Sequence, residues 1–170
     1  MKRVLLAGIG NIFCGDDAFG CEVVKRLKQA GLPEEATITD FGIRSVDLAY
    51  ALTDGYDAVV LVDAIPNAGQ PGMVYLIEPD LNRLDDGNDP GLSAHGMNPL
   101  TALRMAQRAG GVKGKLLLVG CEPSVLDDPD GSMELSEPVR DAVPRAVEMI
   151  RSLVTDLLSE NHQNTGLVLA

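Results

Sequence analysis

The chain has 170 residues, of which 45% are hydrophobic and 23% are charged, and its formal net charge is −11. This composition excludes a disordered chain, and the length suits one core rather than two. The acidic balance disfavours nucleic-acid binding, and no apolar stretch approaches the roughly 20 residues that cross a bilayer. We therefore expect one domain over 1–158 that binds neither nucleic acid nor membrane. A polar tail follows over 159–170, for which the sequence leaves both disorder and partial docking open.

Strand and helix signals alternate along the first half of the chain. The expected elements, in order, are a strand over 3–9, a helix over 18–30, a strand over 36–41, a short helix capped by Ser45, a continuous apolar strand over 58–62 and an edge strand over 73–77. An uninterrupted apolar strand is typical of the centre of a parallel sheet that is covered on both faces.

The second half continues the same alternation. A loop rich in Asp, Asn and Gly spans 81–92, a helix starts at Asn98-Pro99, a strand covers 115–119, and Ser136 precedes a long helix that Pro144 should kink. The fold class predicted from this pattern is α/β, a three-layer α-β-α sandwich with a mostly parallel five-stranded sheet.

A glycine-rich turn follows the first strand, in the order Gly8-Ile9-Gly10-Asn11 and then Asp16-Asp17. Such a turn resembles a dinucleotide fingerprint, and Asp40 after the second strand could serve as its ribose acid. However, Phe13 occupies the third glycine position, and two carboxylates at the first helix would repel a pyrophosphate. Nucleotide binding is therefore disfavoured.

Acidic side chains follow two predicted strands. Asp16 and Asp17 are either an N-cap pair or functional groups, and we assign Asp16 as the cap or orienting residue and Asp17 as the ligand. Asp63 ends the strand over 58–62, where open α/β sheets carry their chemistry, although it could simply cap the turn at Ile65-Pro66.

His95 is the single histidine of the expected folded body, because His162 falls in the tail. Alone it would be read as a surface residue, yet with two carboxylates it completes a mixed oxygen and nitrogen set that can hold a divalent transition ion. Three cysteines form neither a CxxC pair nor an even disulfide set, which indicates a reducing cytoplasm. The acidic run over 122–137 is read as a solvated loop.

Taken together, the motifs resemble the maturation endopeptidases of [NiFe] hydrogenases over roughly residues 3–153. Three segments resemble family signatures with acidic or histidine sites: the Gly8-to-Asp17 segment, Val62-Asp63-Ala64, and Ser93-x-His95-Gly96-Met97. The run Val119-Gly120-Cys121-Glu122-Pro123 resembles the closing strand. Order and spacing together make the resemblance specific.

The resemblance implies a cytoplasmic, monomeric protease that removes a C-terminal peptide from the nickel-loaded large-subunit precursor. It assigns Asp17, Asp63 and His95 as the catalytic residues and as contacts to the nickel. The nickel belongs to the precursor and serves as a recognition tag, so no permanently bound cofactor is expected.

The chain departs from the family pattern at one loop, which is implied to help recognise the precursor. Asp40-Phe41-Gly42-Ile43 stands where the family usually has an acid, two glycines and a threonine. A non-catalytic nickel-sensing chaperone for the same precursor remains the alternative function, and a nucleotide-binding α/β domain is a third.

Overall fold

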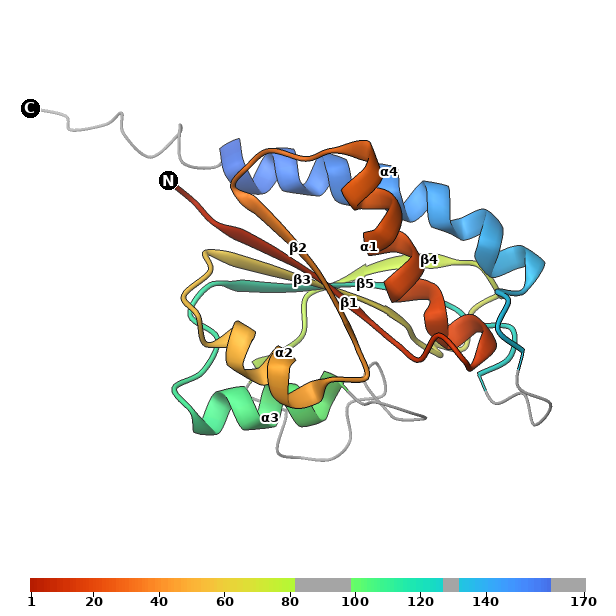
Figure 1. Ribbon diagram of the computed structural model, residues 1–170, viewed down its shortest axis with the longest axis horizontal. Coiled ribbons are helices and arrows are strands. Elements are labelled where there is room, and N and C mark those ends of the chain that lie inside the picture. The colour runs from red at the N-terminus through yellow and green to blue at the C-terminus, as the bar shows by residue number, and fades with distance from the viewer. Residues whose placement is uncertain (82–98, 127–131, 160–170) are drawn as a thin grey trace, which may run out of the picture.

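The computed structural model describes residues 1–81, 99–126 and 132–159. Its elements are β1 (Val4–Ile9), η1 (Gly15–Ala18), α1 (Phe19–Ala30), β2 (Ala36–Gly42), α2 (Ser45–Leu52), β3 (Ala58–Ala64), β4 (Val74–Ile77), α3 (Pro99–Arg108), β5 (Lys115–Cys121) and α4 (Glu137–Ser159). The strands form one sheet in the order β2-β1-β3-β5-β4, with α1 and α4 on one face and α2 and α3 on the other (Figure 1). The predicted three-layer α/β class is confirmed.

The centre of the sheet is parallel and buried. Strands β1, β3 and β5 run in the same direction and pair in register, and β2 adds a parallel edge. Strand β4 pairs antiparallel with β5, as an edge strand. Because the four parallel strands point the same way, their carboxyl ends meet at one rim of the sheet, where acidic side chains from distant segments can converge.

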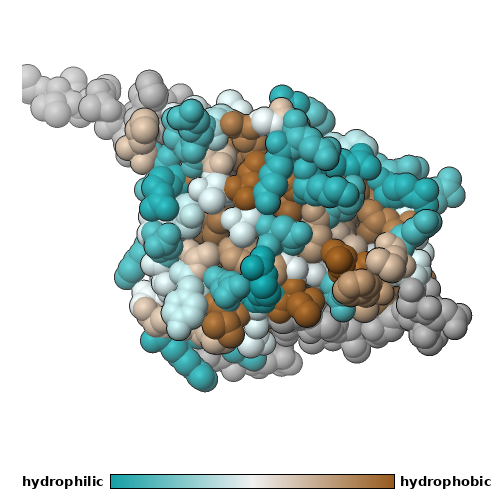
Figure 2. Space-filling model, viewed as in Figure 1, coloured by the Kyte–Doolittle hydropathy of each residue, from teal (hydrophilic) through white to brown (hydrophobic). Residues whose placement is uncertain are grey.

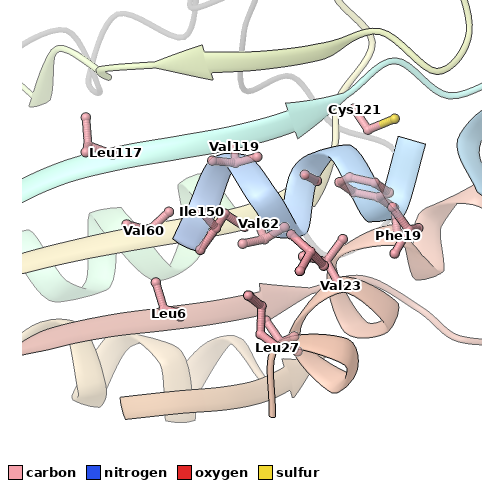
Figure 3. Packing of buried hydrophobic residues seen from close by; sticks show 14 of the residues in the cluster. Leu6, Phe19, Val23, Leu27, Val60, Val62, Leu117, Val119, Cys121 and Ile150 are labelled. Carbon is pink, nitrogen blue, oxygen red and sulfur yellow. The ribbon is translucent and has the colours of Figure 1, made fainter. Parts of the chain in front are cut away.

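Two hydrophobic clusters hold the layers together. One lies between the sheet and the helices α1 and α4. Figure 3 shows part of it, including Phe19 of α1, Val62 of β3 and Ile150 of α4. The other lies between the sheet and α2 and α3, with Leu61, Leu103 and Leu118 fully buried. Burial on both faces explains why the central strands are continuous apolar runs.

Two glycines, Gly10 of the turn after β1 and Gly20 of α1, allow close packing. A Cβ on Gly10 would lie 1.7 Å from the carbonyl oxygen of Asp17, and a Cβ on Gly20 would lie 2.1 Å from that of Val62. Both distances are far below contact distance, so these positions require glycine. The glycines therefore let η1 and α1 press against the ends of β1 and β3.

Several boundaries differ from the sequence prediction. Ser45 is the first helical residue of α2 and not its cap; Arg44 is the N-cap and makes no side-chain cap bond. The Arg44 guanidinium instead donates to the carbonyl oxygens of Asp40 and Phe41. Asp63 lies inside β3 rather than after it, because β3 extends to Ala64 beside β5.

Of the remaining predictions, one concerns Pro144 and the others concern segments outside the described residues. Pro144 does lie within α4. The loop over 82–92, Asn98 and the tail from residue 160 onward lie outside the described residues, and the domain boundary after residue 158 stays a prediction.

Candidate active site

Asp17 is placed at the carboxyl rim by the short 3-10 helix η1. Its side chain is 7% exposed, and its Oδ2 accepts a hydrogen bond from the backbone N–H of Asn11 at 2.7 Å. The backbone N–H of Asp17 donates to the carbonyl oxygen of Cys14 at 3.1 Å. Both bonds are local to the turn that follows β1, so this turn is one of the features that hold the Asp17 carboxylate in place.

Asp63 reaches the same region from β3, which contacts η1. Its side chain is 6% exposed. Burial raises the pKa of its carboxyl group well above the ordinary value, and the negative charge of Asp17 raises it further, while a hydrogen bond from the backbone of Ala64 opposes both. The two aspartates therefore lie near each other, and the charge of Asp17 opposes ionisation of Asp63.

Cys21 on α1 borders the pair. Its thiol donates to the carbonyl oxygen of Gly10 at 3.5 Å. Burial raises its pKa strongly, and the charges of Asp40, Asp63 and Asp17 add to the effect in that order. A thiol with a raised pKa stays protonated and is neither a nucleophile nor a ready metal ligand. Asp17 and Asp63, rather than Cys21, are therefore the groups that can react or bind a metal in this region.

Of the two roles expected for Asp16, helix cap or orienting residue, the structure contradicts the first. Neither η1 nor α1 has a side-chain cap bond, so the interpretation of Asp16 and Asp17 as N-caps of the first helix is wrong. The Asp16 carboxylate turns instead toward segments more than 100 residues downstream, where it accepts bonds from Ser124, Val125 and Ser136. Ser136 directly precedes α4, as predicted, but its hydroxyl donates to Asp16 at 2.9 Å.

Glu122 is a buried acid that the sequence analysis missed. One carboxylate oxygen accepts from the backbone N–H groups of Asn67 at 2.7 Å and Gly69 at 3.1 Å, and from the Tyr75 hydroxyl at 3.2 Å. The acidic run over 122–137 was interpreted as solvated, which is wrong for this residue. The signal was its position just after a buried strand, the same criterion that selected Asp63.

An open groove of about 360 Å³ lies beside the pair, between the turn 10–13 and the segment 40–44. Ile12, Phe13 and Ile43 are exposed along it. Figure 2 shows brown surface gathered on this side of the molecule, around the end of β2 and the turn after β1. An exposed apolar cluster next to buried acids is typical of a surface that receives another molecule.

The unusual loop 40–43 shapes this groove through a β-bulge. Gly8 pairs with Asp40 and Ile9 with Gly42, so Phe41 is the extra residue. The Phe41 side chain is buried with the cluster under α2 and α3. Gly42 has a φ of +54°, in the left-handed region, so the glycine retained here is the one the backbone requires.

His95 lies outside the described residues, so the structure does not report whether it joins Asp17 and Asp63. Among the residues of 1–81, 99–126 and 132–159, no group of three or more His, Cys, Asp or Glu is placed to hold a metal ion. None of the helices in these ranges is long and apolar enough to cross a membrane.

Comparison with known proteins identifies the family of this chain. The sequence profile of the HycI hydrogenase maturation protease family matches residues 21–153. A putative hydrogenase maturation protease of Methanocaldococcus jannaschii is 32% identical over 150 residues, which cover 88% of this chain and 94% of that protein. The hydrogenase expression/formation protein HupD of Rhizobium leguminosarum is 32% identical over 147 residues, covering 86% of this chain and 71% of that protein.

Solved structures give the same result. The hydrogenase maturating endopeptidase HybD from E. coli superimposes with a TM-score of 0.75 at 25% identity, covering 91% of this chain and 93% of that one. A hydrogenase 2 maturation peptidase from a Thaumarchaeota archaeon has a TM-score of 0.68 at 32% identity, covering 91% and 99%. The chain belongs to the hydrogenase maturation protease family and is an enzyme of the peptidase class.

Proposed function

We propose that this protein is the endopeptidase that removes a C-terminal peptide from the nickel-loaded large-subunit precursor of a [NiFe] hydrogenase. The observation that carries the proposal is the pair of buried, mutually opposed carboxylates, Asp17 and Asp63, at the carboxyl rim of the central strands. Membership of the maturation protease family supports the peptidase reaction. The nickel is part of the substrate, and no resident cofactor is needed.

The charges of the pair favour a cation as the recognised group. Without a cation, burial penalises ionisation of Asp63, and the charge of Asp17 adds to the penalty. A divalent ion presented by the precursor reverses that balance, because it attracts both carboxylates and displaces the proton from Asp63. His95, by resemblance to the family, contributes an imidazole to the same ion. Nickel-loaded precursor is then bound in preference to nickel-free precursor.

Cleavage adds water across the scissile amide. The water oxygen bonds to the carbonyl carbon, the C–N bond breaks, and the leaving amine takes up a proton. The substrate's nickel polarises the carbonyl or the water, as a Lewis acid does. A carboxylate that does not touch the nickel accepts the proton of the water. Asp40 suits this role, because it is exposed, lines the groove and lies near Cys21 beside the pair.

The groove next to the pair receives the precursor chain around the cleavage point. Its apolar side chains Ile12, Phe13 and Ile43 contact apolar residues of the precursor, and Asp40 offers a negative charge at the same place. Where the family usually has a threonine, Ile43 adds apolar surface. This difference determines which hydrogenase precursor the enzyme accepts.

The test is to incubate the purified protein with precursor that does or does not carry nickel and to weigh the large subunit by mass spectrometry. Loss of a C-terminal peptide from the nickel-loaded form alone is expected. Asp17→Ala should abolish this loss while the variant unfolds at the same temperature as the wild type. A matched control is Asp54→Ala, which changes an exposed aspartate that is salt-bridged to Arg3, at a distance from the rim.

Two results would contradict the proposal. If the precursor binds tightly in the nickel-loaded form but keeps its mass, the protein is a nickel-sensing chaperone. If Asp17→Ala processes the precursor at the wild-type rate, the role assigned to the pair is wrong. The assay contains only the purified protein and the precursor. Size-exclusion chromatography of the same protein sample tests the expected monomer.

A further inference from the structure

Asp16 is a buried carboxylate near the site that accepts four hydrogen bonds. It is 1% exposed. Its Oδ2 accepts from the backbone N–H groups of Ser124 at 2.8 Å and Val125 at 3.1 Å and from the Ser136 hydroxyl at 2.9 Å, and its Oδ1 accepts from the Ser136 N–H at 2.7 Å. All four donors belong to the segment between β5 and α4. One side chain therefore joins η1 to a segment more than 100 residues downstream.

The segment that carries Asp16 is one short helical turn, buried and held on both sides by neighbouring segments. Helix η1 has four residues, and its N-cap Cys14 makes no side-chain cap bond. On one side its backbone is tied to residue 132, through the Gly15 N–H and the Ser132 carbonyl oxygen at 2.6 Å. On the other side Asp17 meets Gly10 and Asn11. Isolated short helices are unstable, so contacts with neighbouring segments, the four bonds of Asp16 among them, determine where this one lies.

We infer that Asp16 is a positioning residue for catalysis: it clamps η1 to the β5–α4 segment so that the neighbouring Asp17 stays opposite Asp63. Asp16 does not touch the substrate. It acts because it and Asp17 are adjacent in one short turn, so a shift of the first side chain moves the second. This inference rests on the proposed function for its activity test. It also has a structural test that needs no precursor.

Asp16→Asn is the variant of choice, because it keeps the size of the side chain and removes the negative charge and one acceptor oxygen. We expect kcat for precursor processing to fall about 10- to 100-fold, with KM within about threefold. A displacement of about 1 Å in a catalytic group lowers the rate by up to about 100-fold. Hydrogen exchange of the Asn11 N–H should accelerate about tenfold or more, because its acceptor is Asp17.

Glu122→Gln is the matched control. Like Asp16, Glu122 is buried and accepts several hydrogen bonds. Its three donors belong to Asn67, Gly69 and Tyr75. We expect it to lose thermal stability to a degree similar to Asp16→Asn. Its kcat, measured well below the melting temperature, should stay within about twofold of the wild type, and Asn11 exchange should not change.

Ser136→Ala keeps the inference testable if Asp16→Asn does not fold, because it removes one of the four bonds and leaves Asp16 in place. We expect a smaller effect in the same direction, about threefold in kcat and in Asn11 exchange. If either folded variant leaves kcat and Asn11 exchange unchanged, or if Glu122→Gln changes them equally, the inference is wrong. A wild-type protein that leaves the precursor intact instead contradicts the proposed function, while Asn11 exchange still decides the role of Asp16.

Discussion

Two buried acids at the same rim, Glu122 and Asp63, have opposite surroundings. Glu122 accepts three hydrogen bonds from the segment that follows β3 and from β4, so its charge is compensated by donors that the fold supplies. Asp63 has a raised pKa because burial and Asp17 oppose its ionisation more than the backbone of Ala64 favours it. Glu122 holds chain segments together, whereas the charge of Asp63 is left to be stabilised by a bound cation.

This difference separates structural from reactive carboxylates at the rim. A buried charge without sufficient compensation is costly in a resting protein, and such residues concentrate at functional sites. Asp16 belongs with Glu122 by this criterion, since it accepts hydrogen bonds from three backbone N–H groups and from the Ser136 hydroxyl. Position after a strand does not distinguish the two kinds of acid; their hydrogen-bond donors do.

The largest expected effect falls on processing by Asp63→Asn. The amide keeps the shape of the side chain but cannot bind nickel as a carboxylate or exchange a proton, so the rate of peptide removal should fall by about 10²- to 10⁴-fold. The rate is measured as the appearance of the shortened large subunit by mass spectrometry. Circular dichroism should show an intact fold. A variant that retains a tenth or more of the wild-type rate would place Asp63 with the structural acids.

The fold and the Asp17–Asp63 pair could be predicted because they follow from local patterns. Continuous apolar runs identified β1, β3 and β5, and the rule that parallel strands share one rim brought Asp17 toward Asp63. The bonding of Asp16 and Glu122 could not be predicted, since each depends on backbone donors from segments distant in the chain. Likewise the bulge at Phe41 depends on how β2 pairs with β1. Sequence position indicates where an acid lies but not which groups compensate it.

The next effect is on stability and concerns Glu122→Ala. Removing the carboxylate leaves the N–H groups of Asn67 and Gly69 and the Tyr75 hydroxyl without this acceptor, and we expect the free energy of unfolding to fall by about 3 kcal/mol. Urea unfolding measures the change. Glu34→Ala, at an exposed position before β2, should change it by less than about 0.5 kcal/mol. Equal losses in the two variants would remove the basis for calling Glu122 structural.

A third, smaller effect appears in the pH dependence of stability. The pKa of Asp63 is higher in the folded than in the unfolded protein, so the folded state binds its proton more tightly. The stability contributed by protonated Asp63 is therefore complete below about pH 4, near the unfolded pKa, and is lost as the pH rises through the folded pKa. Asp63→Asn should not show this loss.

The measurement is the difference in unfolding free energy between Asp63→Asn and the wild type at several pH values. This difference should become more favourable to the variant from about pH 4 upward, with a slope of at most about 1.4 kcal/mol per pH unit. A difference that does not vary with pH would mean that Asp63 is compensated as fully as Glu122 is.

The smallest effect tests whether the groove next to the reactive pair, rather than apolar surface in general, receives the precursor. Ile43 is 54% exposed in the groove, and Leu76 on the edge strand β4 is 50% exposed. Ile43→Thr replaces the ethyl branch of the side chain with a hydroxyl group and should raise KM about three- to tenfold with kcat unchanged, because the apolar burial lost from the docked complex is worth about 1 kcal/mol. Leu76→Thr has nearly the same exposure and should leave KM unchanged. If the two substitutions raise KM equally, precursor binding does not depend on the groove, and the reactive acids must recognise the nickel without help from loop 40–44.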